Sequence, residues 1–382
     1  MKIAIVGAGP AGLYFAYLMK KADPAHVIDV FEQNPKGATY GFGVVFSDAA
    51  LTHLEDADDA FYAALDARAE HWDDLTIIHR DERVPIDGNG FSGISRLALL
   101  EILQDLCEEA GVHVHHGVTV EDLARFGGCD LVVGADGVNS VVRRLRQEQF
   151  QPEVSELTNR FIWYGTSKVF PTLSLTFRSH GSGSYVAHHY RYASDKSTFI
   201  VECDAATFEA AGFGGMDPDA SRRLCEEIFA PDLEGHPLIS NNSIWRRFPV
   251  LTNANWRAGN TVLIGDALRS IHFSIGSGTR LAMEDAIALF RAFQAHPGQV
   301  SDALDAFIET RKPQVDKLLS GARGSYEWYE QFAGRLQLDP LGLAHDYMTR
   351  SGRVSEERLA KIAPRFTKAW SAQKTACPPV PR

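Results

Sequence analysis

The sequence of 382 residues predicts an α/β fold in which a parallel-sheet domain is interrupted by a domain of antiparallel sheet. A strand, a glycine-rich turn and a helix open the chain, short aromatic and β-branched strands fill the middle, and strand–helix pairs follow. This pattern predicts one domain over residues 1–155 and 251–315, an antiparallel-sheet domain over 156–250, and helices over 316–382.

Composition narrows the class of protein. Lys and Arg number 38 against 49 Asp and Glu, and the net charge of −11 disfavours binding to nucleic acid or to an anionic membrane surface. The five cysteines are scattered and form no CxxC pair, so neither a zinc cluster nor a disulfide framework is expected. No apolar run approaches the roughly 20 residues of a membrane span. We therefore expect a cytoplasmic protein without a metal site that acts on small molecules.

The opening segment "MKIAIVGAGPAGLYFAYLMKK" predicts a nucleotide-binding turn. Lys2–Val6 form a strand, Gly7, Gly9 and Gly12 fit GxGxxG, and a helix follows. In such a turn Gly9 leaves room for a pyrophosphate and Gly12 lets the helix approach the strand, while free N–H groups of the helix N-terminus face the phosphates. Ala11, inside the turn, is grouped with the expected cofactor-binding residues.

Two charged residues are expected to serve the same nucleotide. Glu32 ends the next strand, about 20 residues beyond Gly12, where a carboxylate can bind a ribose hydroxyl. Arg96 stands in the first turn of the amphipathic helix "ISRLALLEILQDLCEEAG", where a cation opposes the helix dipole and so suggests a nearby anion. We expect the buried stripe of that helix to be Leu97, Leu100, Leu103 and Leu106.

A second GxGxxG, in "GNGFSG" at residues 88–93, tests the first. The segment before it, "RDERVPID", is charged and broken by proline, and the strand after the following helix ends in no acidic residue. We interpret this match as a coincidental loop.

Two later stretches each run from an apolar strand into a polar turn. "CDLVVGADGVNSVVRRL" contains Asp136 and Arg143, and "GNTVLIGDALRSIHFSIGSGTRLAMEDAIALFRAF" contains Asp266, Gly276 and Gly278. An aspartate after a buried strand can bind a polyol, and glycines at a helix entrance let backbone N–H groups reach an anionic ligand. Asp136 and Arg143 have a second interpretation, because an aspartate before a helix is also a good N-cap.

In this order and spacing, the three motifs resemble the single-component FAD-dependent aromatic hydroxylases of the p-hydroxybenzoate hydroxylase class, over residues 1 to about 315. The resemblance implies a Rossmann-like FAD-binding domain. It also implies that Asp266 binds the ribityl chain and that Gly276 and Gly278 face the pyrimidine edge of the flavin. Asp136 and Arg143 are then expected near the FAD phosphates and the nicotinamide donor.

The chain departs from the general family pattern, GDAAH followed by proline and GxGxN, at Leu268, Arg269, Phe273 and Arg280. "GDALRSIHFSIGSGT", "WYGTS", "HHYRY" and "STFIVE" are instead similar to a narrower group that contains salicylyl-CoA and 2-aminobenzoyl-CoA hydroxylases and a tryptophan-derivative hydroxylase of violacein biosynthesis. "GTRLAMEDAIAL" favours the CoA-thioester enzymes.

The resemblance implies an aromatic-ring hydroxylase. NADH or NADPH, as a transient co-substrate, reduces FAD, and one oxygen atom of O2 passes through a flavin C4a-hydroperoxide to the ring. The expected substrate is a hydroxy- or aminobenzoyl-CoA such as salicylyl-CoA, and the alternative is a tryptophan or indole derivative as in violacein synthesis. Two alternative functions from other classes are a flavin dehydrogenase or oxidase and a flavin-binding regulator. Regiochemistry, nicotinamide preference and oligomeric state stay open.

The middle of the chain supplies the expected substrate layer. "RFIWYGTS", "LSLTFRS", "SYVAHHYRY" and "STFIVEC" predict an antiparallel sheet that roofs the flavin ring. His188 shares a strand face with Tyr190 and Tyr192, and we expect His188 and His272 to contact the substrate or move its proton. A purely structural role for His188 stays open. Phe273 is expected to give apolar cover beside the flavin. Surface cations that can meet CoA phosphates are Lys168, Arg178, Arg191, Arg246 and Arg247.

Overall fold

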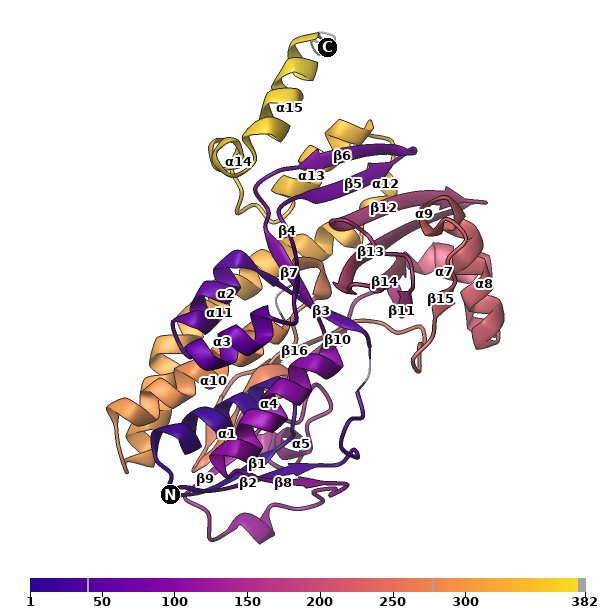
Figure 1. Ribbon diagram of the computed structural model, residues 1–382. Coiled ribbons are helices and arrows are strands. Elements are labelled where there is room, and N and C mark those ends of the chain that lie inside the picture. Colours follow the sequence, from indigo (N-terminus) through magenta and orange to yellow (C-terminus); the bar gives the residue numbers. More distant parts are fainter. Residues whose placement is uncertain (40, 277, 377–382) are drawn as a thin grey trace.

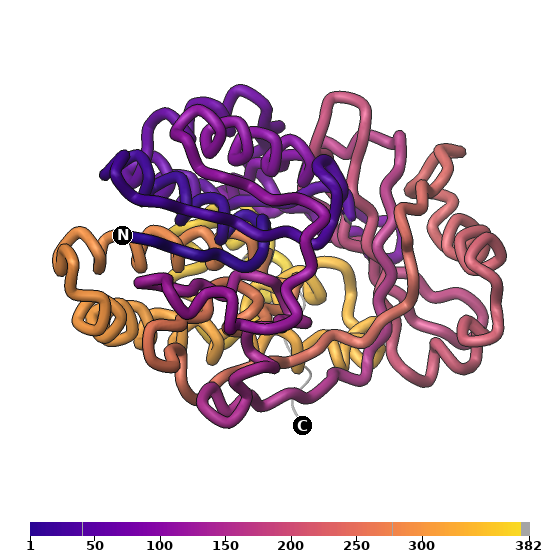
Figure 2. The backbone as a smooth tube through the Cα atoms, turned by 90° about the horizontal axis from the view of Figure 1, so that it is seen from below, coloured from indigo at the N-terminus to yellow at the C-terminus, as the bar shows by residue number. Residues whose placement is uncertain are grey.

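A computed structural model describes residues 1–39, 41–276 and 278–376. The predicted fold class is confirmed: a largely parallel sheet and an antiparallel sheet form two lobes, and helices at the C-terminal end of the chain pack against the second lobe (Figure 1). Figure 2 shows the indigo N-terminal strands and the salmon helices α7 (Ala205–Ala211) and α8 (Pro218–Ile228) on opposite sides of the molecule. No helix in the described residues is long and apolar enough to cross a lipid bilayer.

The first lobe is built on a six-stranded sheet. Its strands, in spatial order, are β17 (Arg257–Ala258), β18 (Thr261–Leu263), β9 (Leu131–Gly134), β1 (Lys2–Val6), β2 (Val27–Glu32) and β8 (His113–His116). All pairings are parallel except β17 with β18. The central strands are almost entirely apolar and buried, as expected for a parallel sheet covered on both faces. The carboxyl ends of β1, β9 and β18 lie together, so the turns that follow them meet.

Four helices cover this sheet. They are α1 (Pro10–Ala22), α4 (Arg96–Ala110), α10 (Gly278–Ala295) and α11 (Val300–Tyr329), with α1 packed between α4 and α10 (Figure 1). The expected buried stripe of α4 is correct at Leu103 and wrong at the other three leucines. Leu103 is buried together with Leu99, Ile102 and Cys107, while Leu97, Leu100 and Leu106 are half-buried. The approach of α1 decides which stripe of a leucine-rich helix faces the core, and the helix sequence alone does not contain that information.

The second lobe is built on a seven-stranded sheet. Its strands, in spatial order, are β15 (Leu238–Ile239), β11 (Arg160–Thr166), β14 (Lys196–Cys203), β13 (Gly183–Ala193), β12 (Leu173–His180), β5 (Leu75–His79) and β6 (Glu82–Ile86). The four strands predicted between residues 160 and 203 are present and antiparallel. The sheet also takes β5 and β6 from the earlier part of the chain, with β5 parallel to β12. Pro85 in "RDERVPID" is accommodated because β6 is an edge strand.

The second GxGxxG leads into a strand, so its interpretation as a loop was wrong for residues 91–93. β7 (Phe91–Ser95) lies between β3 (Gly43–Ser47) and β4 (Glu70–Trp72). Gly93 allows a close approach, because a Cβ there would lie 2.3 Å from the carbonyl oxygen of Arg191. Gly93 therefore serves packing between the three-stranded sheet β3–β7–β4 and the second lobe.

Two features join the lobes. β10 (Pro152–Glu156) and β16 (Pro249–Asn253) form an antiparallel pair where the chain leaves and re-enters the first lobe. The C-terminal helices α13 (Pro340–Thr349), α14 (Glu356–Ile362) and α15 (Pro364–Ala376) lie near β5 and β6 (Figure 1), and side chains of all three join one hydrophobic cluster with these strands. The Asp87 carboxylate caps α15 by accepting hydrogen bonds from the backbone N–H groups of Arg365 and Phe366.

Candidate active site

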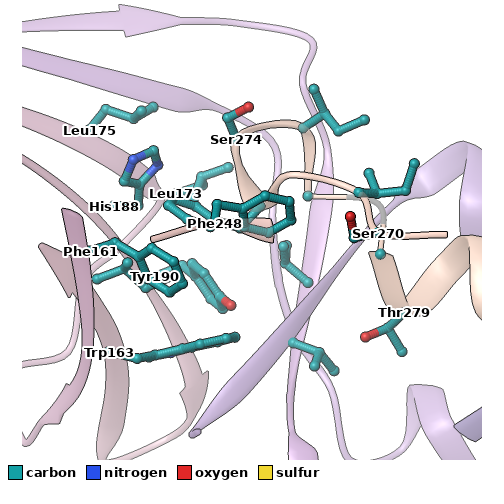
Figure 3. Close-up of a pocket in the computed structure, with 18 of the residues that line it drawn as sticks. Phe161, Trp163, Leu173, Leu175, His188, Tyr190, Phe248, Ser270, Ser274 and Thr279 are labelled. Atoms are coloured by element: carbon teal, nitrogen blue, oxygen red, sulfur yellow. The ribbon is translucent and has the colours of Figure 1, made fainter. Parts of the chain in front are cut away.

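A cavity of about 840 Å³ lies where the two lobes and the C-terminal helices meet (Figure 3). Its polar end is formed by the turn after β18 and by the start of α10, and its other walls come from β3, β7, β11, β12, β13 and α13. The walls are largely apolar, and seven aromatic side chains contribute to them: Phe91, Phe161, Trp163, Tyr190, Phe248, Phe273 and Tyr347. Such a cavity suits a flat aromatic ligand.

The polar end brings together four of the predicted residues: Asp266, Arg96, Gly276 and Gly278. Gly276 has φ +57°, the left-handed conformation that glycine tolerates, and it turns the chain into α10. The Arg96 guanidinium has no hydrogen-bond partner among the described residues. Asp266 is exposed and lines the cavity; desolvation by the surrounding protein raises its pKa, and Arg96 and Arg269 only partly offset that effect. Burial likewise lowers the pKa of Arg96.

The GxGxxG turn has the geometry that the motif predicts. Gly7 has φ +103°, and a Cβ on Gly12 would lie 2.2 Å from the Gly7 carbonyl oxygen. Gly9 differs: a Cβ there would meet only the carbonyl oxygen of Ala135, at 4.0 Å, so the space beside it is open. Ala11 is buried in the first turn of α1. The space at Gly9 and the free N–H groups at the start of α1 are what a pyrophosphate requires.

Glu32 lies at the end of β2, beside this turn. One carboxylate oxygen accepts a hydrogen bond from the Ala8 N–H at 3.0 Å, and the other accepts from the backbone N–H and side-chain amide of Asn34 at 2.9 and 2.7 Å. These contacts orient the carboxylate at the edge of the open space.

Asp136 and Arg143 have structural partners. One Asp136 oxygen caps α5 (Val141–Leu145) by accepting from the N–H groups of Val141 and Val142, while the other is buried without a partner. The Arg143 guanidinium donates to the carbonyl oxygens of Ala267, at 2.8 Å, and Val138. Arg143 thus ties the turn after β9 to the turn after β18, and neither residue lines the cavity.

His188 lies on β13 and lines the cavity, as does Tyr190; Tyr192 does not (Figure 3). Nε2 of His188 lies 3.4 Å from a carboxylate oxygen of Glu202 on the neighbouring strand β14. Both side chains are almost fully enclosed, with 8% and 2% of their surface exposed. Burial of Glu202 acts to raise its pKa, but the hydrogen bond from His188 and the positive potential of nearby groups prevail, so its pKa is lowered.

His272 does not reach the cavity. Its ring is 3% exposed and stacks on Phe273 at a centroid distance of 4.2 Å, and its Nδ1 accepts a hydrogen bond from the Ser274 N–H. Burial lowers the pKa of His272 to about 4. Phe273 lines the cavity and stands between the rings of His272 and His188. The two predicted histidines are thus separated by the predicted aromatic residue.

Other lining residues were not predicted. Phe161 and Trp163 alternate on β11, a period-two aromatic pattern that would have identified them. The wall made by Tyr347, Met348 and Arg350 comes from the C-terminal helices, and no sequence signal points to it. Arg350 fastens that wall to the loop before α10, donating 2.9 Å hydrogen bonds to the Ser274 carbonyl oxygen and to Ser325 Oγ.

The five candidate cations for a phosphate divide into two groups. Lys168, Arg178 and Arg191 form ion pairs with acidic residues outside the cavity. Arg246 and Arg247 are exposed and also line the cavity, so they lie at its rim. Arg247 lies 3.5 Å from Glu156.

The described residues fit FAD on the grounds of this structure alone. The space beside Gly9 is open, one Asp136 oxygen is buried without a partner, and the Arg96 guanidinium, which lines the cavity, has no hydrogen-bond partner among the described residues. A dinucleotide flavin has a pyrophosphate for the turn and a ring for the aromatic cavity.

Comparison with known proteins establishes the class. A family model described as an FAD binding domain matches residues 108–322, and one described as an NAD(P)-binding Rossmann-like domain matches residues 5–39. The chain belongs to the FAD-binding domain family of flavoprotein monooxygenases, and its cofactor is FAD.

Three relatives show which enzymes this chain is similar to in sequence. The chain is 38% identical to a salicyloyl-CoA 5-hydroxylase of a Streptomyces species over 92% of this chain and 70% of that protein. It is 37% identical to a 3-hydroxy-4-methyl-anthranilyl-[aryl-carrier protein] 5-monooxygenase of Streptosporangium sibiricum, over 94% and 97%. It is 33% identical to a protodeoxyviolaceinate monooxygenase of Chromobacterium violaceum, over 100% and 96%.

A solved structure confirms the fold. The tetrameric form of 2-methyl-3-hydroxypyridine-5-carboxylic acid oxygenase superimposes with a TM-score of 0.72 at 16% identity, over 94% of this chain and 95% of the other.

Proposed function

We propose that the protein hydroxylates the ring of an aromatic acyl thioester, such as a hydroxy- or aminobenzoyl-CoA, with NADH or NADPH as electron donor and O2 as oxygen source. The observation that carries the proposal is one cavity whose lining includes seven aromatic side chains together with Asp266, the start of α10, His188, Arg246 and Arg247. The names of the two relatives at 38% and 37% identity, both of which denote thioester substrates, support it.

Each group of residues has a role that follows from its position at the site. Asp266, Gly276 and the start of α10 hold the flavin ring and its ribityl chain at the polar end, and the GxGxxG turn, with Glu32, holds the pyrophosphate and the adenosine ribose. When bound and reduced, the flavin supplies the electrons that activate oxygen. Phe273 and the other aromatic walls exclude water from the reacting carbon, and His188 faces the substrate ring.

The thioester handle is assigned to the rim. Arg246 and Arg247 line the cavity away from its polar end. Arg350 also lines the cavity, but its guanidinium is already hydrogen-bonded to the Ser274 carbonyl oxygen. The charges of Arg246 and Arg247 suit the phosphate groups of a phosphopantetheine arm, and binding energy gained there positions the ring without touching the reacting carbon. Arg247 is paired with Glu156, so binding of a phosphate to Arg247 requires that this ion pair break.

The test is NAD(P)H oxidation by the FAD-loaded protein with and without candidate rings, scored together with a product mass gain of one oxygen atom. Hydroxybenzoyl and aminobenzoyl thioesters are expected to accelerate oxidation, and free acids less so. Arg246→Met with Arg247→Met is expected to raise KM for the thioester far more than it lowers kcat, and added salt is expected to act in the same direction. Arg125→Met with Arg223→Met, at two exposed arginines outside the cavity, serves as the control.

A second candidate is a tryptophan or indole derivative, favoured by the 33% identity to the protodeoxyviolaceinate monooxygenase. If an indole compound is hydroxylated efficiently and no aromatic thioester stimulates NAD(P)H oxidation, the substrate is an indole derivative and not a thioester.

A further inference from the structure

A buried carboxylate, that of Glu202, lies behind the cavity wall next to His188. Glu202 has 2% of its side-chain surface exposed, does not line the cavity, and lies 3.4 Å from Nε2 of His188, which does line it. His188 on β13 and Glu202 on β14 sit on the same face of the sheet, since Val186 is the direct partner of Glu202 and His188 is two residues further along. A charge this deeply buried needs a specific partner.

The hydrogen bonds around Glu202 indicate whether its carboxyl group is ionised and which nitrogen of His188 carries the hydrogen. Asn159 donates from its amide nitrogen to the other Glu202 oxygen at 2.8 Å and to the Tyr329 carbonyl oxygen at 2.9 Å. Glu202 therefore accepts on one side from an amide and faces the imidazole on the other, which favours the ionised carboxylate. An ionised carboxylate needs a donor, so Nε2 of His188 carries the hydrogen.

This arrangement leaves Nδ1 of a neutral His188 as a proton acceptor. Nδ1 has no hydrogen-bond partner among the described residues and is not completely enclosed, and the side chain borders the cavity. The cavity side of the ring is thus basic, and the hidden side is held by a carboxylate.

The other titratable groups near His188 do not take over this role. His272, across Phe273, stays neutral at physiological pH because burial lowers its pKa to about 4. Burial raises the pKa of Tyr329, 5.1 Å away between ring centroids, and also that of Tyr190 on the same strand. The Arg350 guanidinium, on the C-terminal wall, is already committed to three hydrogen bonds.

We infer that His188 and Glu202 form a proton-accepting dyad that removes the proton of a hydroxyl group on the substrate ring, so that the site takes hydroxyaryl in preference to aminoaryl substrates. His188 is the catalytic base and Glu202 is its positioning residue. The inference rests on the proposed function and narrows its substrate class.

The step is balanced within the site. The O–H bond of the substrate breaks, its electron pair remains on the oxygen, and the proton bonds to Nδ1 of His188. The resulting imidazolium is stabilised by Glu202, and the aryl oxide donates electron density to the ring, which favours attack by an electrophilic oxygen. An aromatic amine gains nothing from the dyad, because imidazole is far too weak a base to deprotonate it.

The experiment separates this step from turnover. 4-Hydroxybenzoyl-CoA is bound to the FAD-loaded protein without a nicotinamide, and the absorbance band of its phenolate is followed from pH 5 to 9, a range chosen around the ordinary pKa of histidine, about 6.5. The unaltered protein is expected to form phenolate at a pH at least about one unit below that of the free compound. Glu202→Gln is expected to abolish the difference, because a glutamine amide donates to Nε2 and moves the ring hydrogen to Nδ1. The value of kcat for the hydroxyaryl thioester falls by about 100-fold, the usual size of a general-base effect.

Two further variants keep the result interpretable. Glu202→Asp retains a carboxylate and is expected to restore part of the shift. His189→Asn alters the adjacent buried histidine, which faces the other side of the sheet, bonds to Thr176 Oγ1 and does not line the cavity, and it is expected to leave the titration unchanged. FAD content and thermal melting confirm that each variant is folded.

The outcomes distinguish the two levels of proposal. An unchanged phenolate titration in Glu202→Gln, or equal kcat/KM for the amino and hydroxy thioesters, overturns the dyad while leaving an aromatic hydroxylase in place. Failure of every aromatic thioester to stimulate NAD(P)H oxidation overturns the proposed function itself.

Discussion

Arg269 and Asp285 form a bidentate ion pair in the core beneath the turn that carries Asp266. The two pairs of atoms are 2.5 and 2.9 Å apart, and the side chains are 3% and 0% exposed. Arg311 adds a third contact at 2.9 Å, and the Gly265 N–H donates to the same carboxylate at 3.0 Å. One aspartate on α10 therefore holds α11 and the turn after β18 in position. Arg269 is one of the positions at which the sequence departs from the general family pattern.

Asp285→Asn is expected to destabilise the protein by about 3–5 kcal/mol, because it leaves the buried Arg269 guanidinium without its anion; Arg311 keeps a second anion, Glu284, at 2.9 Å. Urea unfolding of the apoprotein measures the change. Asp316→Asn, which breaks the exposed pair with Lys312, is the control and should cost at most about 1 kcal/mol. Similar losses in the two variants would contradict a supporting role for the buried pair.

Gly9→Val and Gly12→Val are expected to fail differently. The Gly9 side chain would project into open space, so the fold should persist while the pyrophosphate is blocked and FAD is lost. The Gly12 side chain would lie 2.2 Å from a backbone oxygen, so the fold itself should weaken. Melting temperature and the flavin released on denaturation, expected to be FAD and not FMN, measure both effects. Full FAD occupancy in Gly9→Val would contradict the assigned turn.

Asp266→Asn is expected to bind FAD more weakly by about 1.5–3 kcal/mol, the usual value of a hydrogen bond to a charged group. Flavin titration of the two apoproteins measures the change. Unchanged affinity in the variant would show that the Asp266 carboxylate does not hold the cofactor.

His272→Phe is expected to flatten the acid limb of the stability profile. The folded pKa of His272 is about 4 against 6.5 for a free histidine, so its contribution is complete above 6.5 and is lost as the pH falls toward 4. Phenylalanine keeps the ring packing against Phe248 and Phe273 without the titration. Unfolding free energies between pH 4 and 7 measure the difference, and a slope identical to that of the parent would exclude His272 as its source.

Local signals predicted the strand, glycine turn and helix at the start of the chain. The strand, turn and helix at Gly7–Gly12 are contiguous in sequence, and their geometry follows from backbone constraints that only glycine relieves. The strand face of His188 was likewise predictable, because side chains alternate along β13.

The positions of His272, Glu202 and β6 could not be predicted from the sequence, because they depend on contacts between residues that are far apart in the chain. His272 looked suitable because it is polar and close to the flavin loop, but Phe273 separates it from the cavity. Glu202 was missed because its role depends on pairing between β13 and β14. β6 was missed because its proline and charges are tolerated only at the edge of a sheet that forms much later in the chain.

The C-terminal wall of the cavity has a consequence for the order in which the protein matures during synthesis. The GxGxxG turn, Asp266 and α10 are translated before Tyr347, Met348 and Ile362, which complete the lining. A ribosome-bound chain that stops short of α13 already contains every strand of both large sheets but lacks this wall and the Arg350 clamp. The segments that carry the GxGxxG turn and Asp266 are thus synthesised before the helices that close the cavity, so the cavity is completed only after both large sheets have been synthesised.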